Sequence, residues 1–121
     1  MRFGESTDGD TTVSGVKVNM TVCGKHTVIE VSQRDDGDFD VKAETDCDNV
    51  REFVDMLGTL SLVDLTDKKT SKVWECFKKA RMSSNCITPA AVMQAAWIEA
   101  GLLSKNLALM NHHVSIEYLD K

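Results

Sequence analysis

Residues 16–45 read VKVNMTVCGKHTVIEVSQRDDGDFDVKAET, and this stretch decides the fold. Apolar and polar residues alternate along it in three runs, which is the period-2 pattern of strands with one buried face. The predicted strands are 16–22, 26–33 and 39–45. Gly24-Lys25 fits a two-residue type II′ hairpin turn, and the Asp-Gly within residues 34–38 tolerates the positive φ of a second turn. The stretch therefore predicts a three-stranded antiparallel meander.

After Cys47 the hydrophobic period changes to 3.6 residues, which predicts helices. Either Asp46 or Asp48 suits the N-cap of the first helix, and Gly58 indicates its end. A second helix is predicted over residues 71–81. The apolar face of the first helix consists of Val50, Phe53, Val54, Leu57 and Leu60.

The third helix carries the clearest signals at its ends. Thr88 is its predicted cap, Pro89 takes the first helical position, and Gly101 ends it. Alternation then returns in a short C-terminal strand at Val114, Ile116 and Tyr118. The order predicts an α+β fold, in which the meander is followed by three helices on one face and a short C-terminal strand.

The 121 residues are expected to form a disordered tail at 1–14 and a single α+β domain at 15–121. The 14 basic and 19 acidic residues give a net charge of −5, which argues against general nucleic-acid binding. No apolar run approaches the roughly 18 residues that span a bilayer, and the N-terminus lacks the apolar core of a secretory signal. We therefore expect a cytoplasmic protein that binds neither membranes nor nucleic acids.

Four cysteines are the unusual feature of the composition. In a reducing compartment such cysteines are more often metal or redox groups than disulfides. Cys76 lies on the apolar face of a predicted helix, so we expect it in the core. Cys23 and Cys47 end strands that point the same way, which places them at one edge of the sheet about 10 Å apart. Cys86 directly precedes the third helix.

These positions suggest a metal site. Cys47 and Cys86 stand at helix starts, where the partial positive charge favours thiolate, the ligand form for zinc, iron–sulfur clusters and copper(I). His26 is expected to pair with Cys23 across the turn, so the three cysteines and His26 could form a Cys3His zinc site. Each cysteine could also be a small buried hydrophobic residue. The alternative oxygen ligands are Asp46 and Asp48.

The arrangement of Cys23-Gly24, Cys47 and Cys86 resembles the iron–sulfur cluster assembly scaffold family (the IscU/NifU N-terminal type) over about residues 16–101. The resemblance implies a small α+β domain in which these three cysteines hold a nascent cluster or zinc. It also implies protein partners in cluster or sulfur delivery. The chain has Lys25 where that family has Asp, and Asn85 where it has His.

The chain is also similar to a small cysteine-containing family of unknown function from anaerobic bacteria and methanogens. That family is centred on the same three cysteines, and the resemblance implies an anaerobic, cytosolic setting without implying an activity. The similar segments are Val18-Asn19, Val22-Cys23-Gly24, Thr45-Asp46-Cys47, Cys86 to Val92 and Glu99 to Leu102.

Three functions are therefore open. The leading hypothesis is a metal or iron–sulfur binding module, a scaffold or carrier, that uses Cys23, Cys47 and Cys86. The second is a sulfur-transfer or redox protein with one reactive thiol, Cys47. The third is a non-catalytic interaction domain with structural cysteines, whose contact surface is the basic stretch Lys68–Arg81. No P-loop, Rossmann, nucleophile-elbow or HExxH motif is present, and a binding protein is favoured over an enzyme.

Overall fold

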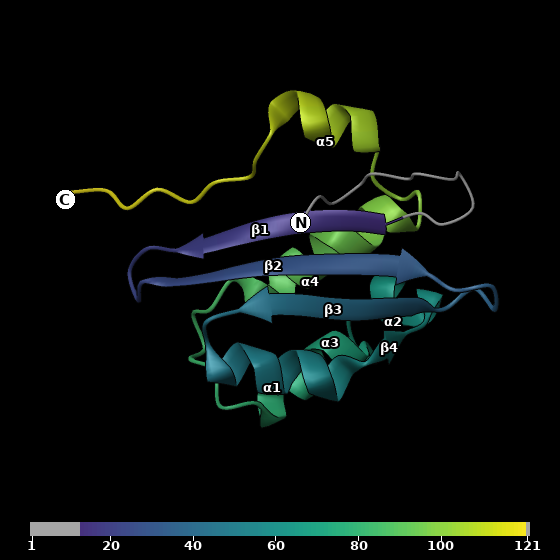
Figure 1. Cartoon of the computed structure of the whole chain (residues 1–121), viewed down its shortest axis with the longest axis horizontal. Helices are drawn as coiled ribbons and strands as arrows, with labels where there is room; N and C mark the ends of the chain where they lie inside the picture. The colour runs from purple at the N-terminus through teal and green to yellow at the C-terminus, as the bar shows by residue number, and fades with distance from the viewer. Residues whose placement is uncertain (1–12, 121) are drawn as a thin grey trace.

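A four-stranded antiparallel sheet, in the order β1-β2-β3-β4, organises residues 13–120, the part of the chain that the computed structural model describes (Figure 1). The strands are β1 (Val13–Met20), β2 (Lys25–Gln33), β3 (Phe39–Thr45) and β4 (Thr59–Leu60). The helices are α1 (Asp48–Leu57), α2 (Leu62–Thr66), α3 (Lys72–Lys79), α4 (Thr88–Glu99) and α5 (Lys105–Asn111). None of these helices has the length and apolar content needed to cross a membrane. The α+β class and the antiparallel meander are confirmed.

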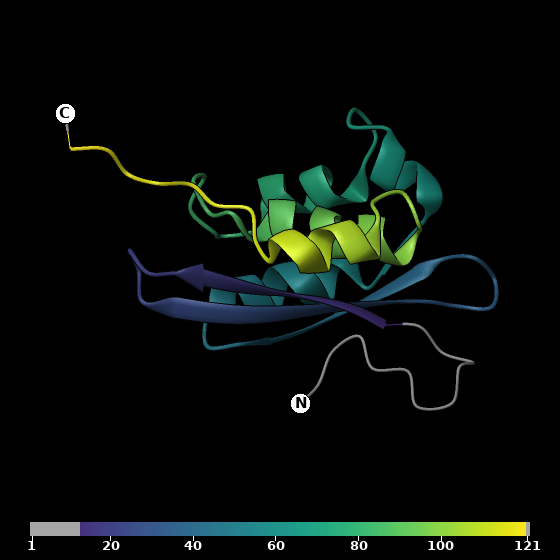
Figure 2. The ribbon, with the colours of Figure 1, turned by 90° about the horizontal axis from the view of Figure 1, so that it is seen from above.

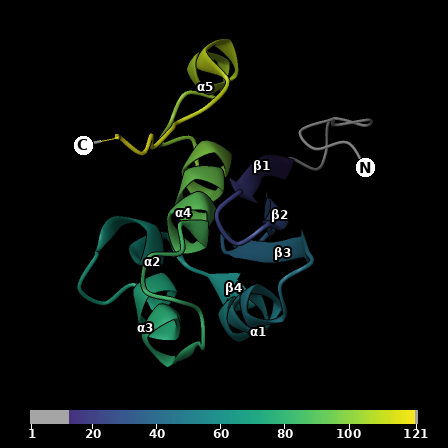
Figure 3. The same ribbon diagram turned by 90° about the vertical axis from the view of Figure 1, so that its left-hand side faces the viewer.

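The sheet buries only one of its faces. Ile29 and Val31 in β2 point into the core, whereas Lys42 and Glu44 in β3 stay exposed on the other side. This is the alternation expected of an antiparallel sheet that faces water on one side. The helices gather on the buried side, with α4 across β1 and β2 and α1 beside β3 (Figures 2 and 3). The alternation of residues 16–45 therefore correctly predicts which side is covered.

Helix α4 packs closely on the sheet because its buried surface is built largely of small side chains. Ala91, Ala95 and Ala96 are buried there together with Val92. Spacings of three and four residues place these side chains on one side of a helix. Pro89 lies in the first turn as predicted, although the N-cap is Ile87, one residue before Thr88.

The predicted boundary of the N-terminal tail, after residue 14, is wrong. Val13 and Ser14, expected in the tail, belong to β1, and Ser14 is buried. The remainder of the predicted tail, residues 1–12, lies outside the described residues. The hydroxyl of Ser14 donates to Glu99 Oε1 at 2.9 Å, so a polar residue is buried here with a partner.

The first hairpin turn is longer than predicted. It spans residues 21–24, with the Gly24 N–H donating to the Met20 carbonyl at 2.8 Å. Gly24 has φ of +74°, a left-handed conformation that glycine adopts without steric cost. Val22 therefore lies in the turn and is exposed, although it continues the strand alternation.

The segment after α1 also differs from the prediction. Gly58 ends α1 as expected, but Leu60, placed on the helical face by its spacing, belongs to β4 and pairs with Phe39. The short helix α2 follows and was not predicted. The N-cap of α1 is Cys47, rather than Asp46 or Asp48. Pairing with Phe39 buries Leu60, so tertiary contact overrides the helical spacing.

The predicted C-terminal strand is absent from the described chain. Val114, Ile116 and Tyr118 lie in an extended, exposed segment that pairs with no strand among residues 13–120. Helix α5 precedes this segment and was not predicted, so the described chain has five helices instead of three. Alternation indicates that a segment suits a sheet, but it does not supply the neighbouring strand.

One carboxylate links the N-termini of two helices. Asp64 Oδ2 accepts hydrogen bonds from the Ser61 N–H at 2.9 Å and the Ser61 hydroxyl at 3.1 Å, at the start of α2. Its Oδ1 accepts from the N–H of Lys72, the first residue of α3, at 3.0 Å. The first N–H groups of a helix have no partner within it, so Asp64 satisfies a donor that α3 leaves open.

We therefore predict that Asp64→Ala lowers the free energy of unfolding by about 1–3 kcal/mol, because two backbone N–H groups lose their acceptor. Urea denaturation followed by circular dichroism measures this loss. The control is Asp55→Ala, an exposed position on α1, where we expect a change within about 0.5 kcal/mol. Equal effects of the two substitutions would contradict the dual capping role.

Candidate functional site

Three cysteines lie on loops at the same end of the sheet, the left side of Figure 1. Cys23 is in the β1–β2 turn, Cys47 follows β3, and Cys86 is in the connection between α3 and α4. β1 and β3 run in the same direction because both pair antiparallel with β2, so the β1–β2 turn and the end of β3 share an end of the sheet.

The three thiols have different surroundings. Cys23 is exposed, and its Sγ lies 3.6 Å from the Met20 carbonyl. Cys47 and Cys86 are half-buried and pack against the hydrophobic core. The Cys86 Sγ also lies 3.3 Å from the Thr88 hydroxyl at the start of α4. Two of the thiols are thus anchored to the core, whereas the third faces solvent.

The predicted ligands do not form a preformed metal site. Within residues 13–120, no group of three or more His, Cys, Asp or Glu side chains lies close enough together to hold a metal ion. The expected pairing of Cys23 with His26 is wrong, because the four-residue turn shifts the register and Asn19 stands opposite His26. The cysteines therefore share an end of the sheet without converging on one point.

His26 and Asp46 belong to a small polar network at this end of the sheet. His26 Nδ1 lies 3.0 Å from Asn19 Oδ1, and the His26 backbone N–H donates to Asp46 Oδ1 at 2.8 Å. That backbone hydrogen bond is the main reason why the pKa of the Asp46 carboxyl is lowered. The Lys25 ammonium donates to the Asp46 backbone carbonyl at 3.3 Å.

Cys47 is held by two residues that the sequence interpretation overlooked. The Thr45 hydroxyl accepts from the Cys47 N–H at 3.1 Å, and Arg51 Nη2 donates to the Thr45 carbonyl at 2.7 Å. Arg51 also pairs with Asp48, the third proposed oxygen ligand. A threonine two residues before a helix cap is a recognisable turn signal, and Asp and Arg three apart on a helix are typical partners.

The structure confirms the predicted core position of Cys76. Cys76 is buried on α3, and burial is the main cause of the raised pKa of its thiol. A thiol in this environment is a packing group with little nucleophilic character. Cys76 therefore serves as an internal reference for the three cysteines at the sheet end.

The basic stretch Lys68–Arg81 is partly neutralised by contacts within the chain. Lys78 pairs with Glu75 at 3.0 Å, and Arg81 pairs with Glu52 of α1 at 2.8 Å. The ammonium of Lys72 donates to a β4 carbonyl at 3.1 Å. These contacts spread the positive charge among local partners, so the stretch does not present a uniform basic face.

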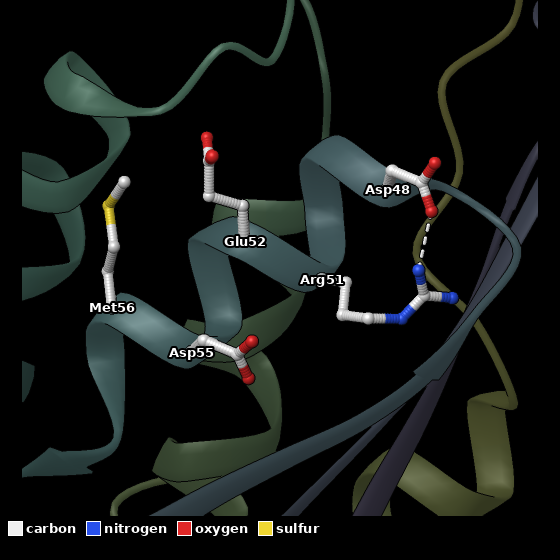
Figure 4. A pocket seen from close by; sticks show the side chains of 5 residues that line it. All are labelled: Asp48, Arg51, Glu52, Asp55 and Met56. Atoms are coloured by element: carbon white, nitrogen blue, oxygen red, sulfur yellow. Dashed lines mark hydrogen bonds and ion pairs between the residues drawn. The ribbon is translucent and has the colours of Figure 1, made fainter.

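A shallow surface hollow lies on the outer side of α1, as Figure 4 shows. Arg51 turns toward Asp48 and pairs with it, and Glu52 is the partner of Arg81. No thiol lines the hollow, which is open to solvent. Its lining consists of Asp48, Arg51, Glu52, Asp55 and Met56.

The lowered pKa of Asp46 predicts a pH dependence of stability. Its stabilising contribution is fully present above the unfolded-state pKa of about 3.9 and is lost as the pH falls through the lowered folded-state pKa. Carboxyl NMR titration should place the midpoint of Asp46 below that of an ordinary aspartate. Asp46→Asn should flatten the corresponding part of the acid-unfolding curve. A normal midpoint for Asp46 would contradict the role of the His26 N–H.

The model of a family of unknown function, DUF6951, matches residues 14–110. This span includes all four cysteines and most of the described elements. No curated protein and no solved structure matches the chain. The match agrees with the expected family of unknown function, and it gives no support for a resemblance to the iron–sulfur scaffold family.

Proposed function

The chain belongs to a family of unknown function, DUF6951, and we propose that it is a metal or iron–sulfur cluster binding module, a scaffold or carrier. The thiolates of Cys23, Cys47 and Cys86 are the proposed ligands of zinc or of a cluster. The observation that carries this proposal is that three free thiols reach one end of the sheet on three separate loops. Thiolates are the protein ligands common to zinc and iron–sulfur clusters.

In this proposal the site is completed only when the metal binds. Cys47 and Cys86 are anchored by the core at the starts of α1 and α4, whereas Cys23 stands exposed on the residue 21–24 turn. Closing the turn brings Cys23 to the anchored pair, and the metal supplies the free energy for that closure. The positive N-terminal ends of the two helices favour anionic thiolate ligands and clusters.

A fourth ligand comes from the same end of the sheet. Asp48 is paired with Arg51, and Asp46 accepts the His26 N–H through Oδ1. Asn19 Oδ1 accepts from His26 Nδ1, which favours the tautomer whose Nε2 binds metals. Because His26 precedes buried Thr27 in β2, its side chain lies on the open side of the sheet, and it would have to reach the thiols around the strand ends. Asp46 and Asp48 remain the oxygen alternatives.

We predict that protein purified without oxygen contains about one zinc ion or one cluster per chain. The measurement is iron, sulfide and zinc content per chain. Replacing Cys23, Cys47 and Cys86 together by Ser should abolish metal binding, whereas Cys76→Ala should preserve it because Cys76 packs in the core. Loading with zinc should also slow hydrogen exchange in the residue 21–24 turn.

Metal-free protein whose stability is insensitive to chelators would overturn the proposal. Iodoacetamide labelling then separates the alternatives. One fast thiol at Cys47, titrating well below about 8.5, favours a sulfur-transfer or redox protein. Slow and equal labelling, with partner binding unaffected by the triple substitution, favours an interaction domain that uses the Lys68–Arg81 stretch.

A further inference from the structure

β1 is an edge strand whose outer side has no paired strand among residues 13–120. The Asp46 N–H donates to the His26 carbonyl, so the backbone N–H and C=O of His26 point toward β3. Along a strand, the N–H and C=O of successive residues point to alternate sides, so those of Thr27 point toward β1. Thr27 pairs with Val18, so the N–H and C=O of Val18 point back toward β2. The backbone groups that point to the outer edge of β1 therefore belong to Val13, Gly15, Lys17 and Asn19.

A contact from α5 agrees with this assignment of the edge. The Lys105 ammonium lies 3.4 Å from the Val13 carbonyl, which is the first acceptor on the outer side of β1. Helix α5 therefore begins beside the start of β1. The edge positions at Gly15, Lys17 and Asn19 continue beyond this contact. An edge of this length is a template on which another strand can pair.

Residues 113–119, here named the C-terminal segment, have the pattern of a strand but no partner in the described chain. Val114, Ile116 and Tyr118 alternate with polar residues, and these three side chains are 83%, 72% and 77% exposed. The preceding helix α5 buries none of its residues either. The described part of the chain thus carries an unpaired strand edge and an unpaired strand-like segment.

The C-terminal segment is complementary to the β1 edge on both faces of the sheet. A strand added to β1 with Val114, Ile116 and Tyr118 on the helix-covered side would place them beside half-buried Val16 and the exposed apolar residues of α5. Its polar residues, together with Leu119 at the end of the segment, would face the open side. There Glu117 and Lys17 carry opposite charges, which is a favourable combination on neighbouring strands.

We propose that two copies of the chain exchange their C-terminal segments, each adding one as a fifth strand to the β1 edge of the other copy. In its own chain, α5 runs alongside β1 and the C-terminal segment leaves the sheet beyond it (Figures 1 and 2). Pairing with its own β1 would require a reversal at His112-His113 directly beneath α5. Exchange about a two-fold axis needs no reversal and covers both edges at once.

The first test alters the edge without altering the pairing between β1 and β2. Because the Lys17 N–H points outward, Lys17→Pro removes an edge donor while the strand keeps its bonds to β2. Sedimentation velocity, from micromolar to millimolar protein and with a thiol reductant to prevent linkage through Cys23, should find a dimer for the natural chain. Lys17→Pro should be monomeric with an unchanged circular dichroism spectrum, and Lys17→Ala should remain dimeric.

The second test alters the C-terminal segment, where no folded contact is lost. Ile116→Asp should give a monomer, whereas Ser115→Asp, on the opposite side of the segment, should keep the dimer. Mixing Lys17→Pro with Ile116→Asp should restore association, because one variant retains an intact segment and the other an intact edge. The proposal would be overturned if the natural chain is monomeric, or if its dimer survives both substitutions. It would also be overturned by a monomer whose amides at 114–119 are protected from exchange.

Discussion

The packing of α4 across β1 and β2 is the contact on which the rest of the structure depends. Its small buried residues, Ala91, Ala95 and Ala96, allow the helix to lie close to the sheet. At the far end of the same helix, Glu99 accepts the Ser14 hydroxyl and the Gln33 N–H, each at 2.9 Å. One helix therefore ties together the beginning of β1 and the end of β2.

The same helix positions the neighbouring elements. The indole N–H of Trp97 donates to the Leu65 carbonyl at 2.9 Å, which holds α2 against α4. The loop that contains Cys86 leads into the start of α4, where Thr88 and Pro89 are buried. The end of the sheet that bears the thiols is thus fixed by core packing, except at the turn that carries Cys23.

One face and one edge of the sheet stay uncovered in the described part of the chain. The open face keeps charged residues such as Lys42 and Glu44 in water. Among the described residues the outer side of β1 remains an unpaired edge, which runs along the strand and ends at the turn that carries Cys23 (Figure 1). Metal binding at the strand ends and strand exchange along the edge would therefore use neighbouring parts of the surface, which meet at Asn19, an edge residue whose side chain contacts His26. Neither would require the other to occur.

The sequence by itself determined the features that depend on local pattern. Alternation predicts Phe39–Thr45 to the residue, helical spacing predicts the core position of Cys76, and Pro89 marks the first turn of α4. Tertiary structure decided the rest, because pairing depends on neighbours that a local pattern does not contain. It set the residue 21–24 turn, which separates Cys23 from His26, and it drew Leu60 into β4 opposite Phe39.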